Sequence, residues 1–265
     1  MKSVIICADD FAQSSAIDEA IIQLIQKNRL TATSCMVLSP RWFESAQRLT
    51  ADIRQKADIG LHLDFTHFGD AHRHTALIAR SLFRNLPPKA IKHCIEVQLN
   101  RFEKALGTAP DYVDGHQHVH QLPQIREALL DVLTTRYSQQ LPWIRIARPP
   151  ANDGLKAKVI SSLGASALEK AAKRMGFRCS GDLLGVYDFS GTSVDYKNAL
   201  NFWLSNVDST LGTPVLMCHP ATAKMEGELS DPIYFARLIE YSVLDSDAMD
   251  GLLQKIKLSR SPQDC

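Results

Sequence analysis

The sequence has few of the features that mark membrane proteins or nucleic-acid-binding proteins. No stretch approaches the ~18 consecutive apolar residues that a membrane-spanning helix needs. The 30 basic and 29 acidic residues give a net charge of +1, and lysines and arginines form no conspicuous run. A basic patch that would attract an anionic polymer is therefore not predicted. We expect neither membrane insertion nor nucleic-acid binding.

The cysteines do not form a disulfide or zinc pattern. The chain has 6 cysteines, which are scattered and form no CxxC pair. This distribution is typical of free thiols in a reducing compartment. Residues 1–10, MKSVIICADD, lack the long apolar core and small-residue cleavage site of a signal peptide. We therefore predict a cytoplasmic protein.

Nucleotide-binding glycine motifs are also absent, since the chain contains neither GxGxxG nor GxxxxGK[ST]. Apolar runs of strand length instead alternate with stretches of helical period along the whole chain. This alternation favours an α/β fold with a parallel sheet. We predict a single-domain, distorted (β/α) barrel over residues 1–258, with an open doubly wound sheet as the alternative, and a flexible tail over 259–265.

The predicted elements follow from these periods. We expect strands at 3–8, 33–38, 58–63, 112–114, 143–147 and 213–218, and helices at 17–25, 41–55, 91–106, 125–133, 155–175, 196–206 and 233–257. Gly107 is expected to end the helix over 91–106. Residues 66–86 are expected to form an active-site loop or a small insertion, and residues 183–189 fit neither period clearly.

Carboxylates and imidazoles follow several of the predicted strands. Asp9 and Asp10 end the first strand, His62 lies in the third, and His219 follows the last. The segment DGHQHVH, residues 114–120, adds Asp114, His116, His118 and His120. In parallel α/β folds the carboxyl ends of the strands meet at one edge, where functional groups collect. We therefore expect these side chains to share one site.

The alternating histidines indicate a metal centre. If the segment stays extended, its aspartate and three histidines point to one face of the strand. Imidazole and carboxylate ligands suit a transition metal such as zinc, and three protein ligands leave room for a water molecule. One strand can supply only one or two ligands, so Asp10 and His62 are natural candidates for the others.

Each of these residues also has a structural interpretation. The two adjacent aspartates fit a turn cap, or the start of a phosphotransfer motif, although that motif usually has an Asp-x-Asp spacing. An isolated His62 fits a core histidine bonded to a backbone carbonyl, and His219 before Pro220 fits a buried structural residue. The histidine run fits a polar surface loop.

Four motifs resemble those of the YdjC-like family of carbohydrate deacetylases. CADDFAQS at residues 7–14 resembles the opening ADDFG-S motif of the family, and GLHLDF resembles its G-[LM]-H motif. VDGHQHVHQLP is similar to its D-x-H-x-H-V-H-x-x-P motif, and LMCHPA to its MCHP motif. The motifs occur in family order. Ala12 stands where the family usually has glycine, and the stretch from 143 to 195 has no clear counterpart.

The resemblance implies a distorted α/β barrel that hydrolyses the acetamide of an N-acetylated sugar such as a chito-oligosaccharide. It also implies one divalent metal ion, magnesium or zinc, held by Asp10, His62 and His116. The residue types favour zinc, because magnesium prefers oxygen ligands. Similar proteins are often dimers, so a homodimer is a further expectation.

The hypothesis for catalysis is attack by metal-activated water. Asp9 is predicted to be the general base, and His219 the acid that protonates the departing amine. His118, His120 and Arg148 are candidate substrate-binding residues, and Arg145 fits either that role or a structural salt bridge. The alternatives are a metal-dependent phosphoesterase, which often holds two or three ions, and a sugar-binding protein without catalysis.

Overall fold

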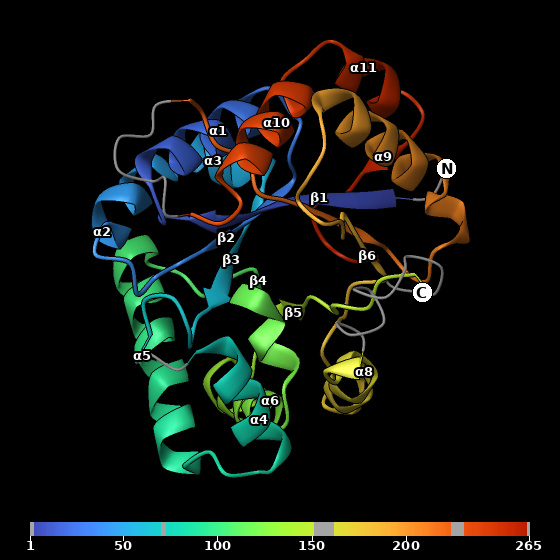
Figure 1. Ribbon diagram of the computed structural model, residues 1–265. Coiled ribbons are helices and arrows are strands. Elements are labelled where there is room, and N and C mark those ends of the chain that lie inside the picture. The colour runs from blue at the N-terminus through green and yellow to red at the C-terminus, as the bar shows by residue number, and fades with distance from the viewer. Residues whose placement is uncertain (1–2, 70–72, 151–161, 224–230, 264–265) are drawn as a thin grey trace.

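The computed structural model describes residues 3–69, 73–150, 162–223 and 231–263. Strands and helices alternate along the chain, as the sequence predicts (Figure 1). The strands are β1 (Ser3–Phe11), β2 (Ala32–Cys35), β3 (Asp58–Leu63), β4 (Tyr112–Gly115), β5 (Trp143–Ile144), β6 (Leu183–Leu184), β7 (Val215–Cys218) and β8 (Lys257–Leu258).

Helices cover the outside of the sheet and account for most of the remaining described residues. The α-helices are α1 (Ser15–Gln26), α2 (Trp42–Ser45), α3 (Ala51–Lys56), α4 (His74–Leu82), α5 (Pro88–Leu106), α6 (Ile125–Arg136), α8 (Ala165–Arg174), α9 (Ser193–Ser205), α10 (Tyr234–Leu244) and α11 (Ala248–Leu253). Three short 3-10 helices are η1 (Ala46–Arg48), η2 (His116–Gln121) and η3 (Val207–Ser209).

The strands form one parallel sheet with the order β5-β4-β3-β2-β1-β7-β6, and β8 pairs separately with β1. In Figure 1 the sheet curls through the centre, with α1, α3 and α10 on one side and α4, α5 and α6 on the other. Between the edges, the amide of Ile144 donates to Arg178 and the amide of Ser180 donates back to Ile144, both at 2.9 Å. The predicted distorted barrel is therefore confirmed, as a single α/β domain with an incompletely closed sheet.

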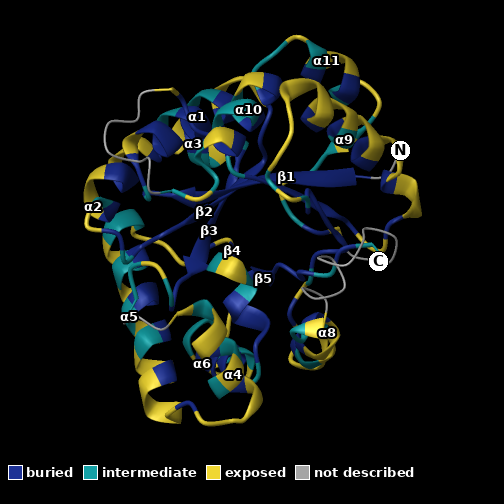
Figure 2. Ribbon diagram, viewed as in Figure 1, coloured by how far each residue is buried: buried dark blue, intermediate teal, exposed yellow. Residues whose placement is uncertain are grey.

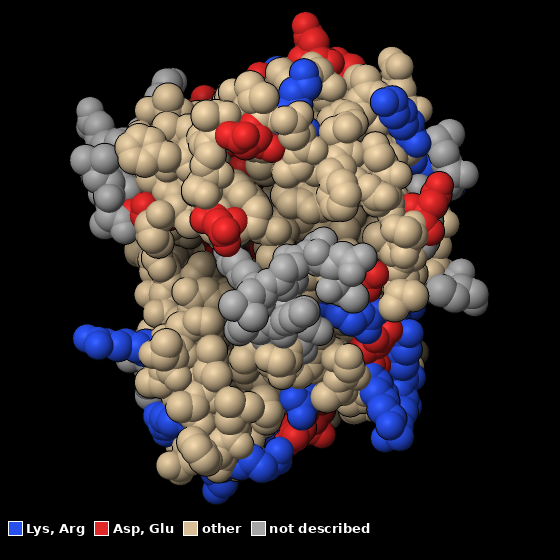
Figure 3. Space-filling view, turned by 45° about the vertical axis from the view of Figure 1, so that its right-hand side comes forward, with Lys and Arg blue, Asp and Glu red and all other residues tan. Residues whose placement is uncertain are grey.

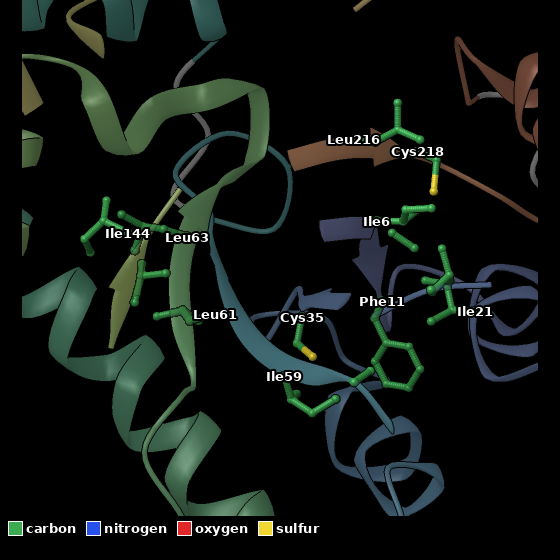
Figure 4. Packing of buried hydrophobic residues seen from close by; sticks show 14 of the residues in the cluster. Ile6, Phe11, Ile21, Cys35, Ile59, Leu61, Leu63, Ile144, Leu216 and Cys218 are labelled. Carbon is green, nitrogen blue, oxygen red and sulfur yellow. The ribbon is translucent and has the colours of Figure 1, made fainter. Parts of the chain in front are cut away.

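Side chains alternate between the two faces of the curled sheet. On β1, Val4 and Ile6 belong to the large apolar cluster between sheet and helices, whereas Ile5 and Cys7 belong to a smaller cluster inside the curl. Figure 4 shows Ile6 beside Ile21 of α1. This period of two is the one expected for a strand buried on both faces. It decides which residues of each strand can reach the interior.

The structure corrects several helix predictions. The helix predicted over 41–55 is divided into α2, η1 and α3, because the Thr50 side chain accepts the amide of Ile53 and starts a new helix. The region over 66–86, predicted to be an active-site loop or a small insertion, contains α4. The helix predicted over 233–257 ends at Leu244, where Ser246 donates to the Val243 carbonyl, and α11 and β8 follow.

Other helix predictions agree with the structure. The stop at Gly107 is confirmed, and its φ of 70° is a left-handed conformation that favours glycine. Of the helix predicted over 155–175, the described part contains α8, and residues 155–161 lie outside the described residues. Within the ambiguous stretch 183–189, β6 occupies the first two residues.

The described part of the predicted tail is anchored rather than loose. Arg260 donates to Asp58 at 3.0 Å, and the amide of Gln263 donates to Thr213. Residues 264–265 lie outside the described residues.

On the face shown in Figure 3, exposed Lys and Arg side chains are interspersed with exposed Asp and Glu side chains. Figure 2 shows buried strands at the centre and exposed residues on the outer sides of the helices. Among the helices that the structure describes, none is both long and apolar enough to cross a membrane.

Candidate metal centre and active-site pocket

A cavity of about 600 Å³ lies at the carboxyl ends of the strands. It is lined by Asp9 and Asp10 of β1, His62 of β3, His116 directly after β4, and His219 directly after β7. The predicted meeting of polar side chains at one edge of the sheet is therefore observed for these five residues, whereas Asp114 and His120 do not line the cavity. This placement follows from the parallel strand order, because every strand delivers its last residues to the same end.

A β-bulge explains how two adjacent aspartates reach the same pocket. In the pairing of β1 with β2, Ala8 lies opposite Thr33 and Phe11 lies opposite Cys35, so β1 contains one extra residue. Asp10 has a φ of 69°, which is uncommon for a residue other than glycine. Without this bulge, successive side chains would point to opposite faces of the strand. The bulge turns both carboxylates toward the cavity.

Asp10, His62 and His116 form a compact group of metal-type ligands. Asp10 Oδ1 lies 3.1 Å from Nδ1 of His116 and 3.5 Å from Nε2 of His62. One ligand atom from each residue lies within 4.8 Å of the other two. A carboxylate and two imidazoles at this spacing suit a divalent transition metal with open coordination positions.

The orientation of His62 is fixed by its other ring nitrogen. His62 Nδ1 lies 2.7 Å from Asp114 Oδ1 and 3.0 Å from the hydroxyl of Ser34. A carboxylate behind a histidine sets its tautomer and aims the second nitrogen at the ligand site. Nε2 of His62 therefore faces Asp10. Asp114 supports a histidine here, although the sequence pattern groups it with the histidines that follow it.

The extended histidine segment predicted from the spacing is wrong. His116 begins the 3-10 helix η2, and Gln117 and His118 have φ values of 52° and 60°. The chain thus turns back at the end of β4 and the side chains separate. His116 reaches Asp10, and His118 lines the cavity. His120 is buried with Nε2 2.8 Å from the carbonyl of Arg145, away from the cavity.

Asp9 is held by a buried arginine, Arg145, that directly follows β5. Both terminal nitrogens of Arg145 donate to the two oxygens of Asp9, at 2.6 and 2.7 Å, and Arg145 has no exposed surface. Burial raises the pKa of the Asp9 carboxyl, but Arg145, His62 and His219 together outweigh burial and hold this pKa below its usual range. Asp9 is therefore ionised near neutral pH, and Arg145 forms a salt bridge rather than a substrate contact.

A second group of possible metal ligands is already paired with the guanidinium of an arginine side chain. Cys7, Asp9 and Asp114 also bring ligand-type atoms together. However, Nη1 of Arg145 donates to Asp9, lies 2.9 Å from Asp114 Oδ2 and contacts the Cys7 sulfur at 3.7 Å. Among the described residues, the triad of Asp10, His62 and His116 is thus the group that is free to take a metal ion.

His219 lies near Asp9 in the cavity but does not bond to it. Its Nε2 is 3.9 Å from Asp9 Oδ2, which is longer than a hydrogen bond. Burial lowers the pKa of His219 to about 4, against the charges of Asp10 and Asp9, which raise it. His219 is therefore neutral at pH 7 in the metal-free protein.

The remaining candidate residues that the structure describes line two different cavities. His67 and His74 of the 66–86 region line the cavity, and His72 lies outside the described residues. Arg148 lines a different cavity, where it pairs with Glu169 and Asp182. The structure therefore places neither Arg148 nor His120 at the candidate site.

Two buried residues of α10 were missed by the sequence interpretation. Arg237 donates to Asp10 Oδ2 at 2.7 Å, and Glu240 accepts the backbone amide of His219. Burial raises the pKa of Glu240 to about 7. The signal available in the sequence was the i, i+3 spacing of two charges on the apolar face of a helix, where charged residues rarely occur without a partner.

Comparison with known proteins supports this assignment of motifs. The YdjC-like protein family matches residues 3–255. The chain is 24% identical over 261 residues to the chitooligosaccharide deacetylase of Citrobacter koseri, covering 94% of this chain and 92% of that protein. It is 29% identical over 170 residues to the mouse carbohydrate deacetylase, covering 57% of this chain and 52% of that protein.

The chain spans about half the length of the mouse and human carbohydrate deacetylases that it matches. A solved structure of a proposed cellobiose-phosphate cleavage protein from Enterococcus faecalis V583 has the same fold, with a TM-score of 0.71 at 20% identity and 97% of both chains covered. From the family match over nearly the whole chain, with its four motifs around one cavity, it follows that this protein belongs to the YdjC-like family.

Proposed function

We propose that this protein is a metal-dependent carbohydrate deacetylase that removes the acetyl group from an N-acetylated sugar. The observation that carries the proposal is the convergence of Asp10, His62 and His116 beside Asp9 and His219 in one cavity. The names of the Citrobacter and mouse relatives support a sugar acetamide as the substrate.

The residues present fit one divalent ion. Asp10 Oδ1, His62 Nε2 and His116 Nδ1 are the atoms that would hold it, and Asp114 supports His62 from behind. When bound, a divalent ion polarises the acetamide carbonyl and lowers the pKa of water. Two nitrogen ligands favour zinc or a similar ion over magnesium.

Asp9 and His219 are proposed to handle the protons. Asp9 is ionised and is next to the ligand triad, so it can accept a proton from the attacking water. Arg145 keeps this carboxylate in one orientation through both oxygens. His219 is neutral at rest, so the proton that Asp9 takes from water must pass to His219, which then donates it to the departing amine and leaves both residues in their starting states. His219 Nε2 lies 3.9 Å from Asp9 Oδ2, and this proximity supports the proposal that both residues act on one substrate group.

A single ion also separates this proposal from a phosphoesterase with several metals. The second ligand-type group contains the guanidinium of Arg145 rather than space for a cation. We therefore expect one metal ion per chain. A measured ratio of one ion per chain would favour the deacetylase over a phosphoesterase with two or three ions.

Acetate release tests the proposed function directly. We expect purified protein to release acetate from N-acetylated glucosamine oligomers of at least one length. Metal-stripped protein should lose nearly all of this activity, because the polarising ion is gone. Restoring zinc should recover the activity, with magnesium and metal-free buffer as parallel samples. A screen in which restored protein releases no acetate from any N-acetylated sugar would contradict the proposal.

Zinc binding is expected to release a proton from His62. Burial lowers the pKa of His62, but Asp114, Asp10 and Asp9 outweigh burial and raise the pKa to about 10. Below pH 10 the metal-free imidazole is therefore protonated, whereas a metal ligand must be neutral. Zinc should displace about one proton, and its apparent affinity should rise with pH between 6 and 9.

Isothermal titration in buffers of different ionisation enthalpy measures this proton. His118→Ala is the control, because it keeps the three ligands and, since burial lowers the pKa of His118, removes no proton that zinc would displace. If zinc affinity and binding enthalpy are independent of pH and buffer, a neutral His62 is present in the metal-free protein and the prediction is wrong.

A further inference from the structure

Helix α10 buries two opposite charges one turn apart, and the proposed chemistry uses neither. The exposed fractions of Arg237 and Glu240 are 2% and 0%. A charge taken out of water is unfavourable unless close partners compensate for it. The partners of each side chain therefore indicate what the helix positions.

Arg237 is fixed between two carboxylates. Its Nη2 donates to Asp10 Oδ2 at 2.7 Å, and its Nε donates to Asp231 Oδ2 at the same distance. Gln13 donates to Asp231 at 3.3 Å, which ties the far carboxylate to the segment after β1. The planar guanidinium thus spans two acceptors with different nitrogens, a geometry that lysine does not have.

The two oxygens of Asp10 have different partners. Oδ2 accepts from Arg237, while Oδ1 lies 3.1 Å from His116 and 3.5 Å from His62. Asp10 also has a φ of 69°, so its side chain departs from the direction of a regular strand. A tertiary contact must therefore determine which oxygen faces the histidines, and Arg237 is the contact that is present.

We propose that Arg237 is a positioning residue for the metal site, holding Oδ2 of Asp10 so that Oδ1 alone is presented to the ion. The inference rests on the proposed function, since it concerns the same ligand triad. Residues that orient a metal ligand typically contribute 10–100-fold to metal affinity. Arg237 does not touch the ion in this arrangement and acts through Asp10.

Glu240 provides a matched comparison on the same helix. Its Oε2 accepts the amide of His219, and its Oε1 accepts the hydroxyl of Tyr187 at 2.6 Å. These partners belong to the His219 side of the cavity and not to the ligand triad. Replacing Glu240 removes a buried charge from α10 without removing a contact to Asp10.

Zinc affinity of the full chain, measured by competition with a chromophoric chelator, tests the proposal. We expect Arg237→Gln to bind zinc 10–100-fold more weakly than the unchanged protein. Arg237→Lys should bind about tenfold more weakly, because one ammonium cannot hold both carboxylates. Glu240→Gln should stay within about twofold of the unchanged protein, since it leaves Asp10 and its guanidinium in place.

Thermal unfolding of each variant shows which proteins are folded, and Arg237→Lys decides the question if Arg237→Gln does not fold. The proposal is overturned if the folded Arg237 variants bind zinc within about twofold of the unchanged protein, or if Glu240→Gln weakens zinc as much as they do. His116→Ala separates failure of the Arg237 proposal from failure of the metal-site proposal. If His116→Ala also leaves zinc affinity unchanged, the proposed metal site itself is wrong.

Discussion

Asp9→Asn is expected to lower kcat for acetate release by about a thousandfold while zinc stays bound. A positioned general base contributes roughly 10²–10⁴-fold to a rate, and an asparagine amide cannot accept the water proton. The substitution preserves side-chain size and leaves one oxygen to accept from Arg145. The ligand triad is unchanged, so zinc affinity should remain close to that of the unchanged protein. Parallel kinetics and chelator competition measure the two effects.

The control is Asp58→Asn, which changes another buried carboxylate. Asp58 is the first residue of β3, whereas the candidate cavity lies at the carboxyl ends of the strands. Asp58 accepts from Trp143 and Arg260 and does not line the candidate cavity. We expect this variant to keep its turnover, even if its unfolding temperature falls. Native acetate release by Asp9→Asn would remove Asp9 from the role of base. Loss of zinc in the same variant would instead place Asp9 among the ligands.

His116→Ala is expected to abolish both zinc binding and turnover. The substitution removes one of three ligands and leaves Asp10 and His62, which cannot enclose an ion alone. The fall in zinc affinity should exceed the roughly 10–100-fold that supporting residues contribute. Acetate release should drop to background, because no ion remains to polarise the carbonyl.

His118→Ala is the matched control two residues away. His118 lines the same cavity but is not a member of the triad. We expect this variant to bind zinc as tightly as the unchanged protein, whatever its effect on sugar binding. If His118→Ala loses zinc and His116→Ala retains it, the wrong histidine of the run has been assigned.

The sequence predicted the α/β barrel and the meeting of Asp9, Asp10, His62, His116 and His219. This prediction succeeds because apolar runs and helical periods are local properties, and because parallel strands end at one edge. The same local logic failed for the histidine run. An alternating pattern is consistent with a strand, but Gln117 and His118 adopt left-handed conformations that no periodicity indicates.

The sequence by itself therefore determined most of the elements, their parallel arrangement and the residue types that collect in the cavity. Only the tertiary structure decided how those residues are paired. Arg145 lies 136 residues from Asp9 and Arg237 lies 227 residues from Asp10, yet each arginine fixes one of two adjacent carboxylates. The physical reason is that a buried charge must find a partner wherever the fold brings one within hydrogen-bond distance. The spacing of residues along the chain therefore does not predict which charged residues pair in the fold.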